Sequence, residues 1–533
     1  MGQTEVRRQQ IELYTRMLGC VVILITGGIL KNEGIAFVAV AYECMMVFWT
    51  LAGNRASEAL RKMLKARAGK GQYRNMEIIG KNILFSQFIV ALLESLLFAG
   101  LSKIIAEKLV HIPYIFSILL MLTPVLFLRI LSETMIGRFE GEGHEMLGVL
   151  IGILRQILLA CTVLLFANLL TGYGEKVANL LEQSLFRAMY GGLGVAIALD
   201  VTELVVVIVL VVLLWKERGG RKPELADGMK TTDSFRDTLR IFYGMMSLTL
   251  LIGCLEQLGI WVGTVLYIRG TEDQAVLLQN LGVLYGKYFV ICILLILPVC
   301  AGVTAMCGRI CSGIQKEDRR LIRRQFQNGV HISLIHGLFF SAFLMVMAEQ
   351  IAGIFGGEQG QMLTKAFQNG SWVVTLMILN YFFLKLLVVA GKRWTVFGCL
   401  AAADCVFAGV EILLRTGEMG DLSLVYGLLA ASLVAALSLG GFCMKALHCS
   451  LDWVNAVAVP VGAALVTAFV AFLAKKLLAP HIGDGMAVAV IFLLAAIVYW
   501  VILFMLRNVR EQELKITPVG RFIYALGHLA HLV

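Results

Sequence analysis

The sequence is poor in charged residues. Asp, Glu, Lys and Arg make up 15% of its 533 residues, whereas soluble domains carry about 25%. Hydrophobic residues make up 59%, and the mean hydropathy is +0.83. This composition excludes an ordinary soluble protein and predicts an integral membrane protein. Because the apolar runs are continuous for about 20 residues and do not alternate, they indicate membrane helices and not barrel strands.

Several motifs of catalysis are also missing. The sequence contains no G-x-x-x-x-G-K-[ST] loop and no H-E-x-x-H motif, and His331 and His336 are not spaced as metal ligands. We therefore predict no metal and no cofactor. No segment outside the apolar runs is long enough for a soluble catalytic domain, so transport is a better prediction than enzymatic activity. The twelve cysteines lie mostly inside apolar runs, which is typical of buried thiols.

The apolar runs predict an all-α, polytopic membrane protein with about fourteen transmembrane helices. The expected spans are 12–31, 35–53, 82–103, 113–135, 147–170, 190–215, 241–267, 283–307, 329–350, 371–390, 395–414, 422–444, 453–474 and 486–506.

The net charge of +10 comes from the loops that alternate with these spans. Because the basic residues gather in 54–81, 216–240 and 308–324, on the side of the N-terminus, the positive-inside rule places both termini in the cytoplasm. We expect a multi-pass protein of the bacterial plasma membrane that contacts anionic phospholipids and does not bind nucleic acid.

One design occurs twice in the chain. The apolar run Ile35–Leu51 contains Glu43 and precedes a basic arm that ends at Arg74. The run Val283–Ala305 contains Lys287 and precedes a second basic arm that ends at Arg324. This repetition predicts two related halves. The arms either recruit anionic lipid or substrate head groups, or only fix the orientation of the spans.

The expected organisation is two six-helix lobes in a parallel pseudo-twofold repeat, followed by two further helices. The parts are an N-terminal lobe (1–215), a cytoplasmic linker (216–240), a C-terminal lobe (241–444), two additional transmembrane helices (445–506) and a cytoplasmic amphipathic tail (507–533).

Several stretches, in this order and spacing, resemble the MOP (multidrug/oligosaccharidyl-lipid/polysaccharide) exporter superfamily. Within it, they are most similar to the branch of stage-V-sporulation-protein-B-like and MurJ-like polysaccharide flippases. The stretches are Gly34–Tyr42 with the arm that starts at Ala59, Leu122–Ile157 with its turn Gly137-Arg-Phe-Glu-Gly141, Tyr285–Pro298 with the arm around Gln315, and Val498–Pro518.

The resemblance implies that two lobes face a central cavity lined by spans one, two, seven and eight. It also implies outward translocation of a polyprenyl-pyrophosphate-linked saccharide, a cell-wall precursor or polysaccharide unit, by alternating access. Enzymes of cell-envelope synthesis would then be partners. The chain departs from this family in having seven prolines and in offering one arginine, Arg16, in the first span.

Ionisable residues inside spans are costly and mark candidate sites. In the cavity that the resemblance implies, Arg16 and Lys287 are candidates to bind a pyrophosphate, and Glu43 and Glu256 are candidates to take up protons or a cation. The alternative for the two cations is that they extend to the membrane interface.

Other buried charges have structural explanations. Asp200 and Glu203, three residues apart, form either a coupling site for protons or cations, or pairs with a residue such as Arg155 or Arg187. Arg129 and Glu133, four residues apart, are expected to neutralise each other.

The sequence thus favours a flippase for a lipid-linked saccharide. A cation-coupled multidrug antiporter of the same superfamily, or a non-transporting membrane scaffold for envelope assembly, are the alternatives.

Overall fold

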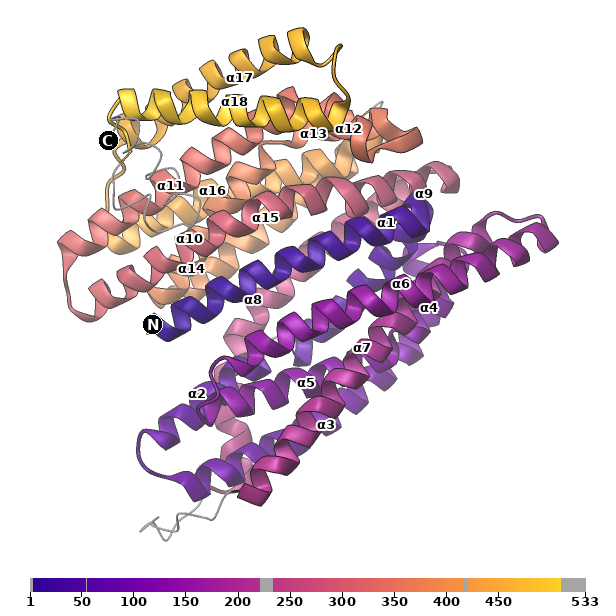
Figure 1. The fold of residues 1–533 in the computed structure, drawn as a ribbon. Helices are drawn as coiled ribbons and strands as arrows, with labels where there is room; N and C mark the ends of the chain where they lie inside the picture. The colour runs from indigo at the N-terminus through magenta and orange to yellow at the C-terminus, as the bar shows by residue number, and fades with distance from the viewer. Residues whose placement is uncertain (1–2, 54, 221–232, 416–418, 510–533) are drawn as a thin grey trace. The chain divides into compact units, whose positions relative to one another are not determined.

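The computed structural model describes residues 3–53, 55–220, 233–415 and 419–509, and within these ranges every regular element is a helix. The α-helices are α1 (Gln3–Ala52), α2 (Ala56–Ala68), α3 (Tyr73–Ile104), α4 (Ile115–Met121), α5 (Thr123–Gly141), α6 (Leu147–Leu181), α7 (Leu185–Gly220), α8 (Phe235–Gly270), α9 (Gln274–Val283), α10 (Phe289–Gln315), α11 (Arg319–Val346), α12 (Ala348–Phe355), α13 (Gly360–Gly370), α14 (Val373–Val389), α15 (Arg393–Leu414), α16 (Ser423–Leu447), α17 (Val459–Leu478) and α18 (Asp484–Met505) (Figure 1).

The helices confirm a polytopic, all-α membrane protein. In the described part of the chain, twelve helical segments are long and apolar enough to cross a membrane, and a thirteenth results if the pair α13 and α14, bent by 52°, counts as one span. Each predicted span coincides with a helix or with two consecutive helices. The predicted amphipathic tail lies mostly in 510–533, outside the described residues.

Helix α1 accounts for two of the predicted spans. Its 50 residues correspond to about 75 Å of helix, whereas the hydrocarbon core of a bilayer is about 30 Å thick. Lys31 interrupts the helix with φ 56° and ψ −175°. The break falls between the predicted spans 12–31 and 35–53, so we count the two parts of α1 as separate crossings.

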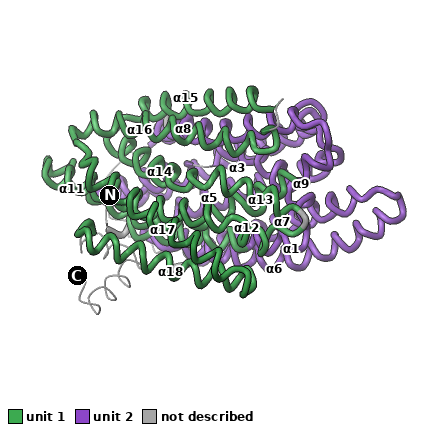
Figure 2. Tube along the Cα trace, turned by 90° about the horizontal axis from the view of Figure 1, so that it is seen from above, with its two compact units in different colours: residues 1–21, 279–533 green, residues 22–278 purple. Residues whose placement is uncertain are grey.

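The chain forms two compact units (Figure 2). Unit 1 comprises Met1–Val21 and Gln279–Val533, and unit 2 comprises Val22–Leu278. These bounds differ from the predicted lobes, because α1 belongs to unit 1 only up to Val21 and α8 belongs to unit 2. The parallel repeat remains a prediction.

Within unit 2, α2 packs against α3, α5 and α8, and the long helices α6 and α7 pair along their length. The apolar side of α2 contributes Ala56, Leu60 and Leu64 to a core with Ile79 and Phe242. Within unit 1, α17 and α18 lie side by side, and α17 packs on α11 (Figure 1).

Two glycines of α5 allow α2 to approach closely. A Cβ atom at Gly137 would lie 2.5 Å from the Cα atom of Ser57, and one at Gly141 would lie 2.7 Å from the Cβ atom of Leu64. The stretch Gly137–Gly141, predicted as a turn, is instead the helical end of α5, and it is a packing surface for the first basic arm.

Candidate functional site

The six candidate residues are divided between the two units. Glu43, Asp200, Glu203 and Glu256 lie in unit 2, and Arg16 and Lys287 lie in unit 1. The acids and the cations therefore belong to different compact units, and each group is described within its own unit.

The second part of α1 and helix α8 share a series of polar contacts in unit 2. Glu43 accepts a hydrogen bond of 2.9 Å from the Thr264 hydroxyl, and the Trp261 indole N–H donates to the Cys44 sulfur at 3.2 Å. Thr50 is hydrogen-bonded to Cys254. Residue numbers rise along α1 as they fall along α8, so the two helices run antiparallel. We call these contacts the α1–α8 seam.

Glu43 is a buried member of this seam, with 9% of its surface exposed. Glu256 is also on α8 but is exposed. It lies two residues from Cys254, which places the two side chains on different faces of the helix. Of the two predicted acids, Glu43 is the one that the seam encloses.

Glu203 is the centre of a buried ion network between α5, α6 and α7. Its carboxylate lies 3.3 Å from Arg129 Nη1 and 3.0 Å from Arg155 Nε. Arg155 also contacts Glu133 at 3.1 Å, and the Ser132 hydroxyl donates to Glu203 at 3.3 Å.

This Glu203 network contains two arginines and two glutamates, so its formal charges cancel. Arg129 and Glu133 interact electrostatically along their helix, as expected, but the ion pairs of the network join different helices. Glu203 has Arg155 as a partner, which was one of the two interpretations of this acid, and its surroundings favour a structural role.

Asp200 has a different environment from Glu203. It accepts a hydrogen bond from the backbone N–H of Val125, in the first turn of α5. A helix start leaves such N–H groups without partners. Asp200 thus lies beside the start of a helix that begins inside the predicted span 113–135, next to Pro124, and its Oδ1 atom is buried without a hydrogen-bond partner among the described residues.

In unit 1, the side chain of Lys385 of α14 contacts neutral polar and aromatic groups. Its Nζ atom lies 3.1 Å from Gln9 Oε1, 3.4 Å from Thr304 Oγ1 and 4.5 Å from the centre of the Tyr381 ring. Arg16 and Glu12 of α1 are its electrostatic neighbours. We call Arg16, Thr304, Tyr381 and Lys385, with Gln9, the Lys385 cluster.

Lys287 lies apart from this cluster. It belongs to the π-helical turn Leu284–Tyr288, and its Nζ atom donates to the Gly356 carbonyl at 3.4 Å. Gly356 follows the end of α12, and its carbonyl also accepts from the Gln359 N–H at 3.2 Å. This contact gives Lys287 a structural explanation.

The first basic arm is α2, and acids of the same unit neutralise part of its charge. Arg61 is buried and lies 3.8 Å from Glu140, and Arg67 contacts Asp233 at 2.6 Å. Lys65 is paired with Glu145. These contacts favour a role in orientation and packing over lipid recruitment for the paired residues.

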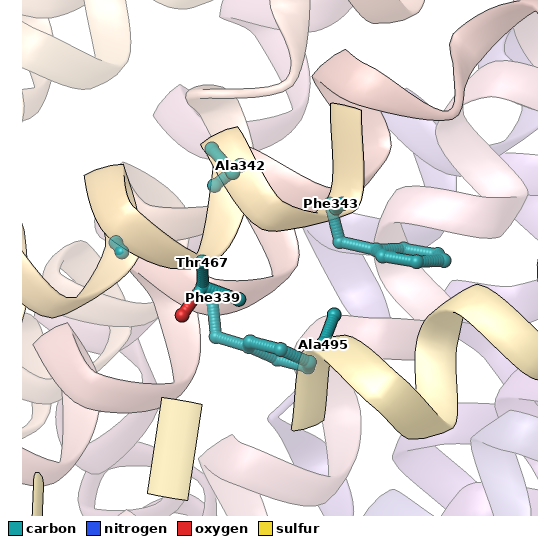
Figure 3. Close-up of a pocket in the computed structure, with 8 residues that line it drawn as sticks. Phe339, Ala342, Phe343, Thr467 and Ala495 are labelled. Carbon is teal, nitrogen blue, oxygen red and sulfur yellow. The ribbon is translucent and has the colours of Figure 1, made fainter. Parts of the chain in front are cut away.

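A recess in unit 1 lies between α11, α17 and α18 (Figure 3). Its lining is apolar apart from Thr467, and Phe339 and Phe343 form much of its wall (Figure 3). It contains no charged group, so it is not a site for a polar substrate. No cluster of His, Cys, Asp or Glu that would hold a metal occurs among the described residues.

The sequence analysis missed one buried acid and one set of contacts. Glu94 lies in the middle of the predicted span 82–103, and the rule that selected Glu43 would have selected it too. The contacts of Lys385 with Gln9 and Thr304 join residues 376 and 81 positions apart, and nothing in the spacing indicates them.

Comparison with known proteins identifies the fold. No protein-family model and no curated protein matches the chain. Among solved structures, it is similar to an inward-facing multidrug resistance MATE family transporter of the MOP superfamily, with a TM-score of 0.63 and 13% identity over 84% of this chain and 98% of that one.

Two further structures agree. A MOP superfamily transporter from Pyrococcus furiosus gives a TM-score of 0.57 and 15% identity, covering 83% of this chain and 95% of that one. The eukaryotic MATE transporter AtDTX14 gives 0.58 and 16%, covering 84% and 96%. The chain therefore has the fold of MATE transporters of the MOP superfamily. Identities this low establish the fold and not the substrate.

Proposed function

We propose that the protein is a cation-coupled exporter of amphipathic organic cations, working by alternating access in a bacterial plasma membrane with both termini in the cytoplasm. The MATE fold supports this function, and one structure with this fold is described as a multidrug resistance transporter. The observation that carries the proposal is the buried carboxylate of Glu43, held between two membrane helices by the Thr264 hydroxyl.

The α1–α8 seam suits this task because Glu43 accepts from a neutral hydroxyl, that of Thr264, and is followed in the chain by Cys44, whose thiol accepts from the Trp261 indole. A carboxylate in such surroundings exchanges a proton or binds a cation at a moderate free-energy cost. A carboxylate that is paired with two arginines, as Glu203 is, does not. Glu43 is therefore the primary coupling acid, and Glu203 stabilises the helices around it.

Changing Glu43→Gln is expected to abolish accumulation driven by a pH gradient. One coupled charge supplies about 2.3 kcal/mol per 100 mV, which corresponds to roughly a 50-fold concentration ratio of substrate. The measurement is uptake of tetraphenylphosphonium or ethidium into proteoliposomes that contain the full chain. The protein must be inserted with its cytoplasmic side facing outward, so that export becomes uptake into the vesicle.

The matched control is Glu107→Gln. Glu107 is exposed and pairs with Lys103, so this variant should accumulate the cations as the wild type does. Wild-type accumulation by Glu43→Gln, with normal amounts of inserted protein, would refute the role of Glu43. Absence of any cation transport by the wild type would refute the proposed function.

A second candidate function is the flipping of a polyprenyl-pyrophosphate-linked saccharide, which the sequence resemblance favours. The Lys385 cluster supports it, because Arg16 and Lys385 place two cations together with the Thr304 and Tyr381 hydroxyls. These are donors that a pyrophosphate would use, and an exporter of cations gains nothing from them. Anionic lipids and enzymes of envelope synthesis would be partners under this function.

Native mass spectrometry of the purified protein distinguishes the two functions. If it is a flippase, polyprenyl-pyrophosphate lipids are retained in preference to phospholipids, and Arg16→Ala or Lys385→Met weakens binding by about tenfold or more, the effect of losing one charged hydrogen bond. Lys476→Met, at an exposed position of α17, is the control. Equal retention of both lipid classes would exclude this function.

A further inference from the structure

Helix α3 has two faces of opposite character. Leu92, Leu93, Leu96 and Leu97 are exposed by 43–61%, as expected for side chains that face lipid. The other face turns into unit 2 and carries Gln87, Ala91, Glu94, Ser95, Phe98 and Ser102, all exposed by 9% or less. A carboxylic acid therefore lies on the inward face of a membrane helix, ten residues before its end at Ile104.

Glu94 differs from Glu43 and Glu203 in its contacts. Both of its carboxylate oxygens are buried and have no hydrogen-bond partner among the described residues. On the same face, the Ser95 hydroxyl and the Gln87 carbonyl oxygen are also buried without a partner. The structure thus contains a row of polar atoms inside the membrane whose hydrogen bonds are not satisfied.

The helices packed against α3 offer Glu94 no counter-charge. Cys254 of α8 is the titratable group that interacts with it. Toward one end of α3, Tyr243 of α8 is hydrogen-bonded to Ser86, and Arg138 of α5 lies against Gly80 and binds Glu142. Toward the other end, Phe48 of α1 packs on Phe98.

Buried charged groups of α1, α2 and α5 have partners elsewhere: Arg61 of α2, a helix that also packs on α3, pairs with Glu140. Arg129 and Glu133 of α5 belong to the Glu203 network, and Glu43 of α1 binds Thr264. Glu256 projects from a face of α8 other than that of Cys254. An ionised carboxylate at Glu94 would have no counter-charge, and burying an uncompensated charge is strongly unfavourable.

We propose that Glu94 is a second proton-binding site of the transport cycle, which carries a proton while α3 is packed as described and releases it when water enters between α3 and α8. Gln87 and Ser95 then provide polar contacts for that water. This inference rests on the proposed export function, and it adds a coupling acid on α3 to the one at Glu43.

The first test detects the proton directly and requires no transport. Dicyclohexylcarbodiimide reacts with protonated carboxylic acids in apolar surroundings. We expect it to label Glu94 in the full-length protein in vesicles, as identified by peptide mass spectrometry, and we expect labelling to fall as the pH rises. Glu94→Gln should lose this label. Failure to label Glu94 across the pH range would overturn the proposal.

The second test measures coupling. Because Gln mimics the protonated acid, Glu94→Gln should lose accumulation driven by a pH gradient but retain exchange of labelled for unlabelled tetraphenylphosphonium at equal concentrations. Glu107→Gln should retain both. Normal gradient-driven accumulation by Glu94→Gln would overturn the coupling role.

The two tests also separate this inference from the proposed function. If the wild type transports no organic cation while Glu94 is labelled in a pH-dependent manner, the export of cations is refuted and the proton site stands. If the wild type transports and Glu94 is not labelled, the export function stands and the inference is overturned.

Discussion

Replacing Glu203 with leucine is expected to destabilise unit 2 by about 3–5 kcal/mol, because it leaves buried arginines without their shared carboxylate. Glu203 is 1% exposed and Arg155 10% exposed, so water does not compensate the loss. The measurement is the midpoint of thermal unfolding in detergent, followed by fluorescence-detected size-exclusion chromatography. We expect a clear fall in that midpoint and a lower yield of folded protein.

Two further variants test whether the loss of stability comes from the unpaired buried arginines. Glu77→Leu removes an exposed acid that pairs with Lys81, and it should change the midpoint little, since exposed pairs contribute about 0–1 kcal/mol. A variant with Glu203, Arg129 and Arg155 all replaced by leucine should recover part of the loss. A midpoint for Glu203→Leu equal to that of the wild type would contradict the structural role of the network.

Adding a single methyl group at Gly137 is expected to displace α2 from α5. The new Cβ atom would lie 2.5 Å from the Cα atom and 2.6 Å from the carbonyl oxygen of Ser57. These are backbone atoms, so the neighbour cannot move aside by changing rotamer, and such overpacking costs about 1–3 kcal/mol. Gly137→Ala should lower the unfolding midpoint and make α2 more susceptible to limited proteolysis.

Gly100→Ala is the matched control for this variant. Gly100 lies in α3, and a Cβ atom there would meet nothing within 4 Å. The substitution should be neutral or stabilising by about 0.5–1 kcal/mol, because alanine favours helix more than glycine does. If both glycine variants unfold at the wild-type temperature, the close packing of α2 on α5 is wrong.

The positions of the membrane helices were predictable from the sequence for a physical reason. A bilayer requires about 20 consecutive apolar residues per crossing and forces the backbone to satisfy its own hydrogen bonds. Ranges such as 147–170 and 395–414 therefore fall within α6 and α15. The break between α4 and α5, inside the predicted span 113–135, depends on local backbone geometry that an apolar run does not reveal.

The partners of buried charges were less predictable. The spacing of Arg129 and Glu133 suggested a contact along one helix, but helix packing brings Glu203 and Arg155 closer to them. Such contacts depend on which faces meet, and apolar helices give few signals of that. Glu94 could have been predicted as a candidate from the sequence, because an acid in the middle of a span is visible without any structure.

The sequence resemblance and the structural comparisons agree on the fold of the superfamily, but they point to different branches of it. The sequence resemblance favoured the flippase branch, whereas the structures described above are MATE transporters. Identities of 13–16% establish the fold and not the side chains that select a substrate. The choice between organic cations and lipid pyrophosphates thus depends on the α1–α8 seam and the Lys385 cluster.

The division of α1 between the two units sets an order for the folding of the chain during synthesis. Unit 2 consists of the continuous segment Val22–Leu278, so it is complete once α8 has left the ribosome. Unit 1 needs the first residues of the chain together with everything after Leu278. The part of α1 before Val22 is therefore made ahead of unit 2 but packs with segments made after Leu278, more than 250 residues later.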